Sequence, residues 1–234
     1  MKKRTFAMLL VAVVSHSVLA DESTVKDPNY INLVESIADN EYATFMRGGD
    51  STIGASVVGP YSASQLLAMY EKNELAANKK LKGKRVRVKS VASEIGENVT
   101  GDAYVKVDGN NEFQNVFLYV NGDDEKILQL EKGSKIDFLC SMDKYIMHTP
   151  MLKKCTFTED SAKKTRADIV AMLLEDKITN KFQAAIRVVY EDNKNTIAKS
   201  CSKLGHTCTD ALLHAASKTT DSQKQRIEEL AKDH

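Results

Sequence analysis

The sequence predicts an α+β protein in which a small β-barrel lies between an N-terminal helix and a C-terminal α-helical region. Five short stretches between residues 85 and 157 alternate apolar and polar side chains as strands do. A short helical stretch separates the third strand from the fourth, and after residue 157 the apolar residues repeat at helical spacing. Five strands with one helix between the third and the fourth is the element order of an OB-fold β-barrel.

Before the barrel, the sequence predicts two helices and one short strand. The first helix is expected at residues 29–39 and the strand at 53–58. The second helix is expected at 63–73, where Ser62 and Gln65 form a capping-box pattern. The apolar side of this second helix should pack on the barrel.

The barrel strands are expected at residues 85–95, 103–108, 112–120, 135–142 and 150–157, with the inserted helix at 123–130. In the first strand, valines alternate with basic residues, so the valines should face the core and the bases the outside. The apolar phase then moves to Val91 and Ile95, which predicts a β-bulge before Val91.

The outer face of the first three strands holds the candidate ligand-binding residues. Aromatic and basic side chains alternate there with inward-facing valines, and OB barrels use this face and its loops to bind oligonucleotides or oligosaccharides. In the competing interpretation, the N-terminal helix or the C-terminal helices cover the aromatic side chains of this face. The candidates are Arg85, Arg87, Lys89, Tyr104, Lys106, Phe117 and Tyr119.

The C-terminal helices are expected at residues 164–175, 179–191, 195–204, 209–217 and 220–232. Gly205 should end the third of them, and Thr207 or Thr209 should cap the next. These helices should form a small bundle that either packs on the barrel or makes its own domain.

The stretch from residue 64 to residue 157 resembles the tRNA_anti-like OB-fold family of small secreted proteins and lipoproteins. The resemblance lies in the order and spacing of Asn73–Ala77, Lys82-Gly83-Lys84 before a Val-alternating strand, Leu130–Gly133 before the fourth strand, and Cys140 and Cys155 in the last two strands. It implies an OB fold and a location in the cell envelope.

The first 20 residues read as a secretory signal peptide. Lys2, Lys3 and Arg4 precede an apolar run, and small residues stand at and before Ala20, so we expect cleavage after Ala20 and a periplasmic or secreted protein. The apolar run is shorter than the ~20 residues of a membrane span, and no later run is longer, so the mature chain should lack a transmembrane segment.

The mature chain is close to neutral. The full sequence has 33 Lys and Arg against 32 Asp and Glu, and three of the basic residues belong to the signal peptide, which leaves a net charge of −2. A nucleic-acid-binding domain usually carries a strong basic excess, so nucleic acid is a less favoured ligand.

Four cysteines in an exported chain allow three disulfide pairings. We expect Cys140 to pair with Cys155, because they lie on consecutive strands, and Cys201 with Cys208, on either side of Gly205. Residues seven apart in one helix lie about 10 Å from each other, so the second pairing requires Gly205 to break the helix.

The sequence carries no recognised motif for catalysis or for a cofactor, so no enzyme activity and no cofactor are expected. No metal site is expected either, because the chain has neither a Cys-x-x-Cys pair nor histidines at ligand spacing. Asp123, Asp124 and Glu125 should instead complement the dipole of the inserted helix, and His148 should be an ordinary loop residue.

The expected organisation is a signal peptide (1–20), an N-terminal segment (21–60), an OB-fold domain (61–158) and a helical C-terminal domain (159–234). The favoured function is a non-catalytic periplasmic binding protein that contacts another envelope protein or component. An oligonucleotide- or oligosaccharide-binding module that uses the candidate residues is the first alternative, and an enzyme of unrecognised kind is the second.

Overall fold

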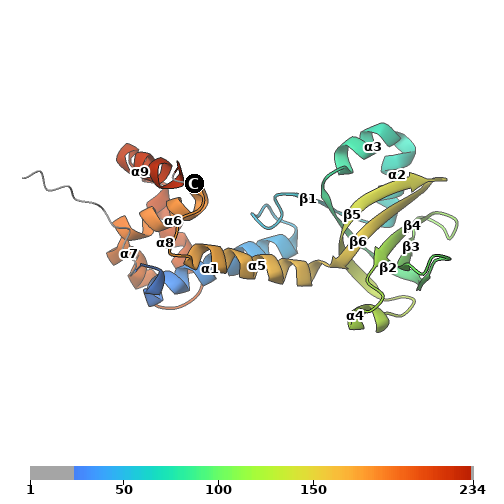
Figure 1. Ribbon diagram of the computed structural model, residues 1–234, viewed down its shortest axis with the longest axis horizontal. Helices are drawn as coiled ribbons and strands as arrows, with labels where there is room; N and C mark the ends of the chain where they lie inside the picture. Colours follow the sequence, from blue (N-terminus) through green and yellow to red (C-terminus); the bar gives the residue numbers. More distant parts are fainter. Residues whose placement is uncertain (1–23, 233–234) are drawn as a thin grey trace, which may run out of the picture.

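The structure, a computed structural model, describes residues 24–232, so the predicted signal peptide lies outside the described residues (Figure 1). The strands are β1 (Val57–Tyr61), β2 (Arg85–Glu97), β3 (Ala103–Asp108), β4 (Asn115–Val120), β5 (Lys135–Ile146) and β6 (Thr149–Phe157). After a 3-10 turn at Thr24–Lys26, the helices are α1 (Pro28–Arg47), α2 (Ala63–Lys72), α3 (Glu74–Leu81), α4 (Glu125–Leu128), α5 (Thr158–Leu174), α6 (Lys181–Asp192), α7 (Lys194–Ser200), α8 (His206–Ala216) and α9 (Asp221–Lys232).

Five strands close into a barrel, in the order β2-β3-β4-β6-β5 with β5 pairing back to β2. The pairs are antiparallel except for β4 and β6, which run parallel, and β1 adds to the outside of β2 as a further parallel strand. The helix α4 stands between the third and fourth barrel strands. This is the OB element order, and it confirms the α+β fold class predicted from the sequence.

The barrel core consists of the side chains that the alternation places inside. Val105 and Val107 of β3, together with Val116 and Leu118 of β4, are fully buried. The apolar side of α2 packs against this core, as expected, and the capping box of Ser62 with Gln65 that starts this helix is present.

The β-bulge of β2 lies later than the sequence suggested. The register with β3 shifts between Ala92 and Glu94, whereas Val91 is half exposed and pairs with Lys135 of β5. The expectation that Val91 faces the core is therefore wrong. The strand bends where it changes partner from β5 to β3, and that change could not be read from β2 alone.

Several elements differ from the prediction. The strand expected at 53–58 is β1 at Val57–Tyr61, and α5 begins at Thr158 where a helix was expected from residue 164. The N-terminal helix α1 extends to Arg47 and ends at Gly48, whose φ of 84° suits a glycine C-cap. The helix α3 was not predicted, although Asn73 caps it by accepting a hydrogen bond at 3.0 Å from the backbone N–H of Ala76.

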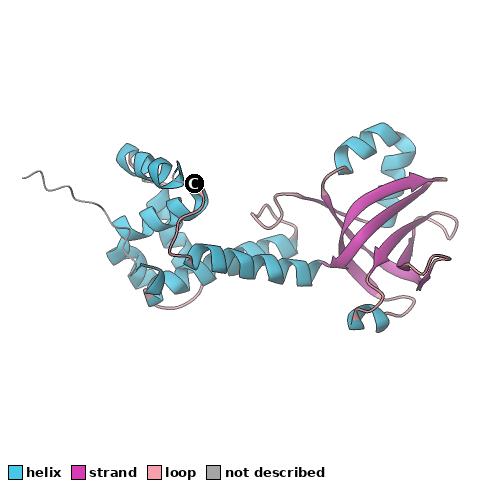
Figure 2. Ribbon diagram, viewed as in Figure 1, coloured by secondary structure: helices cyan, strands magenta, loops and turns pink. Residues whose placement is uncertain are grey.

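The helices α1 and α5–α8 build a second core, most of which lies away from the barrel strands (Figure 2). The helices α1 and α5 lie side by side and run from this helical region to the barrel (Figure 1). Apolar residues of α1, α5, α6, α7 and α8 share one cluster, and α9 packs on α6. Within residues 24–232, no helix has both the length and the apolar character needed to span a membrane.

Both expected disulfides are present in the structure. Cys140 on β5 is bonded to Cys155 on β6, and Cys201 at the end of α7 is bonded to Cys208 in the first turn of α8. Gly205, with φ of 136°, separates these two helices as expected. The predicted threonine cap is wrong, because α8 begins at His206 and no side chain caps it.

Candidate ligand-binding groove

The seven candidate residues of the first three barrel strands fall into two separate groups. The first half of β2 pairs with β5, where Lys89 stands opposite Asp137, whereas its second half pairs with β3, where Glu94 stands opposite Lys106. The basic residues of β2 therefore lie on the β5 side of the bend. The aromatic residues lie on the other side, on β3 and β4.

Arg87 is buried instead of forming part of an exposed face. Its side chain is 2% exposed, and its guanidinium donates bidentate hydrogen bonds to the Asp137 carboxylate at 2.9 and 2.7 Å. It also donates to the backbone carbonyls of Phe45 at 2.8 Å and Met46 at 3.2 Å, which end α1. Arg87 points out of the barrel, as alternation requires, but the end of α1 covers it.

The other two bases of this group also contact β5. Arg85 is half-buried and donates to the carbonyl of Leu139 at 2.9 Å. Lys89 is half exposed, with its ammonium 3.3 Å from the Asp137 carboxylate. This part of the candidate surface ties β2 to β5 and, through Arg87, to the end of α1. Its acidic member, Asp137, was not among the predicted residues.

The second group forms a continuous half-buried surface on β3 and β4. Tyr104 lies opposite Tyr119 and Lys106 opposite Phe117, and the rings of Tyr104 and Phe117 meet edge to face at 5.0 Å between centroids. Pairs of this kind stabilise antiparallel strands.

Glu94, which the sequence analysis did not select, changes the charge of this surface. Its carboxylate accepts hydrogen bonds from the Tyr104 hydroxyl and from the Lys106 ammonium, the latter at 2.7 Å. The hydrogen bond from Lys106, followed by that from Tyr104, lowers the pKa of Glu94, and the same contact raises the pKa of Lys106. The charge of Lys106 is thus balanced within the protein.

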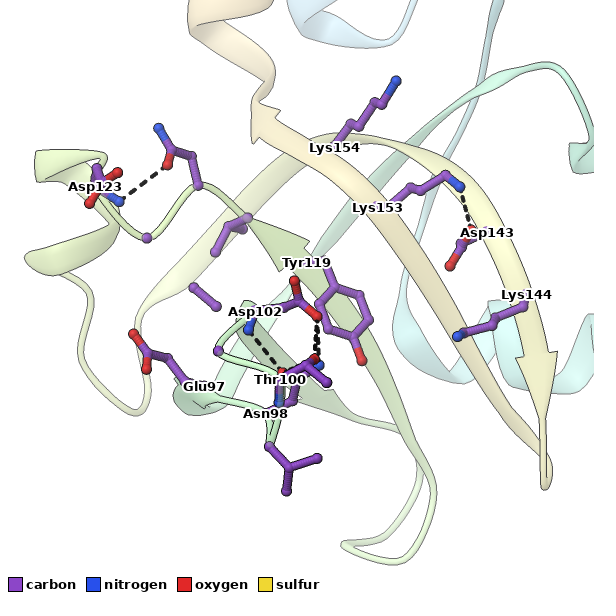
Figure 3. A pocket seen from close by; sticks show the side chains of 16 residues that line it. Glu97, Asn98, Thr100, Asp102, Tyr119, Asp123, Asp143, Lys144, Lys153 and Lys154 are labelled. Atoms are coloured by element: carbon purple, nitrogen blue, oxygen red, sulfur yellow. Dashed lines mark hydrogen bonds and ion pairs between the residues drawn. The ribbon is translucent and has the colours of Figure 1, made fainter.

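A groove of about 910 Å³ opens beside Tyr119 (Figure 3). One wall is the β2–β3 loop, the floor is the end of β4, and the other wall is made by lysines of β5 and β6. Tyr119 is the one candidate residue that lines this groove. Its charged lining residues are four acidic and three basic residues, namely Glu97, Asp102, Asp123, Asp143, Lys144, Lys153 and Lys154.

The loop wall is held by its own hydrogen bonds. The side-chain oxygen of Asn98 accepts from the backbone N–H of Thr100 at 2.9 Å and of Asp102 at 2.8 Å. The Asp102 carboxylate accepts in turn from the Thr100 hydroxyl at 2.7 Å and the Asn98 amide at 2.9 Å. The hydrogen bond from Thr100 lowers the pKa of Asp102 most, and the one from Asn98 lowers it further. Both favour the ionised carboxylate, which lies beside the Tyr119 ring (Figure 3).

The lysines of the opposite wall differ in their surroundings. Lys153 pairs with Asp143 at 2.5 Å. Lys144 forms no ion pair with any residue between 24 and 232 and extends toward Tyr119, whereas Lys154 points away (Figure 3). Lys154 has a φ of 52°, where the register between β4 and β6 shifts. This wall was not predicted from the sequence. The pattern that could have indicated it is the pair of adjacent bases Lys153 and Lys154, which breaks the alternation of the last strand.

The structure also places the residues for which no special role was expected. Asp124 caps α4 by accepting from the backbone N–H of Lys126 at 2.9 Å, and His148 lies 3.5 Å from the Tyr145 hydroxyl in the β5–β6 turn. Among residues 24–232, no group of three His, Cys, Asp or Glu side chains is arranged to hold a metal ion.

Comparison with known proteins bears on this fold. No curated protein sequence matches the chain. A solved structure from Klebsiella pneumoniae, described as a "putative nucleic acid-binding lipoprotein", is similar over 42% of this chain and 89% of its own, with 20% sequence identity and a TM-score of 0.36. The tRNA_anti-like family model matches residues 1–156, well over half of the chain. This protein is therefore a member of the tRNA_anti-like family.

Proposed function

We propose that this protein is an exported, non-catalytic binding protein of the cell envelope, and that its barrel holds an oligosaccharide chain of the envelope in the groove beside Tyr119. The observation that carries the proposal is the lining of the groove, in which one aromatic ring stands among carboxylates, amides and ammonium groups. The location in the periplasm or outside the cell is supported by the signal-peptide pattern and by the two disulfides.

The position of the groove supports a binding role. OB barrels bind chain-like ligands on the face of their second and third strands, between the loop that joins the first two strands and the loop that joins the last two. Tyr119 stands at the end of the third barrel strand, and residues 98–102 form the first of these loops. An elongated ligand can therefore lie across Tyr119 between the two walls.

The charges of the groove favour an oligosaccharide over an oligonucleotide. The four acidic residues of the lining outnumber its three lysines and would repel the phosphates of a nucleic acid, and two bases of the candidate surface are occupied, Arg87 by Asp137 and Lys106 by Glu94. Sugar hydroxyls can both donate to carboxylates and accept from ammonium groups, so a mixed lining suits them. The Tyr119 ring offers an apolar surface for the face of a sugar ring.

The state of the acidic residues supports a non-catalytic role. A general acid needs a pKa near the working pH, whereas hydrogen bonds lower the pKa of Asp102. Asp143 is held in its ion pair with Lys153. These groups are suited to fixed hydrogen bonding and electrostatic contact.

The test is a calorimetric titration of the mature protein with a hexasaccharide of N-acetylglucosamine and, separately, with a single-stranded oligothymidine. We expect binding of the hexasaccharide with little salt dependence. Replacement Tyr119→Ala should weaken it about 10-fold or more, as loss of a stacking platform does, while Tyr119→Phe should retain most of it. Lys144→Ala should also weaken binding, whereas Lys218→Ala, an exposed lysine of the helical region, is the matched control.

Two results would contradict the proposal. Tight binding of oligothymidine that falls steeply with salt would assign the groove to nucleic acid. Hexasaccharide binding that survives Tyr119→Ala unchanged, in a variant with an unaltered melting temperature, would place the sugar elsewhere.

A further inference from the structure

Four large apolar side chains project into solvent at one end of the barrel. They are Leu75, Phe113, Ile146 and Met147, with exposed fractions of 81%, 86%, 43% and 89%. They come from three separate segments: the start of α3, the β3–β4 turn and the tip of the β5–β6 hairpin. We refer to them as the apolar end.

The topology brings these three segments around the C-terminal end of α2. The ring of Tyr70 on α2 stacks on Tyr145 of β5 at 4.4 Å between centroids, which places the hairpin tip beside the helix. The carboxylate of Glu71, the next residue of α2, accepts a hydrogen bond at 3.1 Å from Gln114 of the β3–β4 turn. The tip of the β5–β6 hairpin points away from the helical region (Figure 1).

The hairpin tip keeps its apolar residues at a conformational cost. Met147 and His148 both have positive φ, of 49° and 63°, between the paired residues Ile146 and Thr149. A two-residue turn of this kind strongly favours Asn and Gly, since other residues are strained there. The barrel core does not need Met147, because the side chain is exposed. A large apolar residue at a strained, exposed position therefore indicates a binding role.

Residues 71–75, 112–114 and 145–149, which surround the apolar end, include three carboxylates, Glu71, Glu74 and Glu112, and one lysine, Lys72, so the acidic groups are in excess. Burial, followed by the negative charges of Glu71 and Glu74, raises the pKa of the Tyr145 hydroxyl. Glu112 adjoins Phe113 in the β3–β4 turn. This potential disfavours an anionic lipid surface. It also disfavours a second copy of this chain packed end to end, because the same carboxylates would then face each other.

We propose that the apolar end is a docking surface for a partner protein that presents an apolar segment flanked by Lys or Arg. Such a segment would cover the four exposed side chains and pair its cations with Glu71 and Glu74. This surface is distinct from the groove and does not depend on the ligand proposed for it.

The test is site-specific photo-crosslinking of the full-length protein in its intact cell envelope, with benzoylphenylalanine in place of Phe113. Phe182 on α6, which is also a partly exposed phenylalanine, receives the same probe as the matched control. We expect a protein adduct at position 113 and none at 182. Mapping of the crosslinked peptide should give an apolar segment that contains Lys or Arg.

Two further variants separate docking from folding. Met147→Asn removes the apolar side chain but suits the turn, so the adduct yield should fall at least about 5-fold while the melting temperature stays equal or rises. Glu74→Gln should lower the yield, and the yield of the unaltered protein should fall with added salt.

Four results would overturn the proposal. These are a crosslink to lipid, an adduct with the mass of two copies of this chain, a mapped segment without basic residues, or the absence of any adduct at position 113. Flotation with vesicles of phosphatidylethanolamine and phosphatidylglycerol distinguishes the lipid outcome, because binding to them that is lost in Met147→Asn would assign the apolar end to membranes.

Discussion

At the scale of single residues, the ion pair of Arg87 and Asp137 joins four elements, β2, β5, α1 and α5. Arg87 belongs to β2 and binds the carbonyls at the end of α1, and Asp137 of β5 also accepts a hydrogen bond at 2.8 Å from the Thr158 hydroxyl at the start of α5. Arg87 is buried and the Asp137 side chain is 27% exposed, so the loss of either leaves half-buried or buried polar groups with fewer partners.

The variant Arg87→Met should lower the free energy of unfolding by about 3 kcal/mol, because it leaves the α1 carbonyls without their donor and leaves Asp137 with only Lys89 and Thr158 as partners. Lys89→Met is the matched control, since Lys89 contacts the same carboxylate from a half-exposed position and should cost less than about 1 kcal/mol. Urea unfolding followed by circular dichroism measures both. Equal losses for the two variants would contradict the role given to Arg87.

Asp137 should also make stability depend on pH. Burial acts to raise its pKa, but hydrogen bonds from Arg87 and Thr158 and the charges of Arg87 and Lys89 together lower it below the ordinary 3.8. A carboxyl whose pKa is lower in the folded state contributes stability above its unfolded pKa and loses it as pH falls through the folded value. Between pH 5 and pH 2, the midpoint of urea unfolding should therefore fall less steeply in Asp137→Asn than in the unaltered protein.

At the scale of elements, side chains of α6 hold the loop that follows α5. The side-chain amide of Gln183 donates to the carbonyls of Met172 at 2.8 Å, Lys177 at 3.1 Å and Glu175 at 3.2 Å. Arg187 adds a hydrogen bond to the carbonyl of Asp176 at 2.6 Å. The last turn of α5 has no basic residue of its own, and side chains of α6 donate the hydrogen bonds that the backbone carbonyls at the end of α5 need.

Replacement Gln183→Leu should lower the free energy of unfolding by about 1–3 kcal/mol, because carbonyls at the end of α5 lose their donor in a buried position. Gln225→Leu on α9 changes an exposed glutamine in the same way and should have an effect within about 0.5 kcal/mol. Thermal unfolding compares the two. A neutral Gln183→Leu would show that water replaces the amide.

The elements that the sequence predicted well are those set by local patterns. Alternation placed Val105 and Val107 in the core, and the pair Ser62 and Gln65 marked the start of α2. Features that depend on distant contacts were missed. Nothing near Arg87 in the sequence shows that α1 covers it, and the groove lysines belong to strands far from Tyr119 in the chain.

At the scale of the whole molecule, the structure has a barrel core and a helical core joined by α1 and α5. We propose that α1 and α5–α9 form one domain and that β1–β6 with α2–α4 form the other, so the N-terminal segment and the C-terminal helices belong together. The ring of Phe45, which is buried in the helical core, lies 5.1 Å from the Arg87 guanidinium. Both connecting helices thus meet the barrel at one ion pair.

If that pair fixes the orientation of the two cores, its removal should loosen the molecule. Small-angle X-ray scattering of the double variant Arg87→Met, Asp137→Asn should show a larger radius of gyration and a broader distance distribution than the unaltered protein, at a temperature where circular dichroism shows both to be folded. Lys89→Met should scatter like the unaltered protein. An unchanged curve for the double variant would mean that the packing of α1 on α5 fixes the orientation without the ion pair.

The β5–β6 hairpin has a consequence for how the two proposed surfaces communicate. Lys144, in the wall of the groove, and Ile146, in the apolar end, are separated by one residue along β5, and the Cys140–Cys155 disulfide ties this strand to β6. A partner docked at the tip would stand at the rim of the groove, within reach of its ligand. By thermodynamic linkage, if the ligand changes the affinity of the protein for the partner by some factor, the partner changes the affinity for the ligand by the same factor. The β5–β6 hairpin would then couple binding of a partner at its tip to binding of a ligand in the groove.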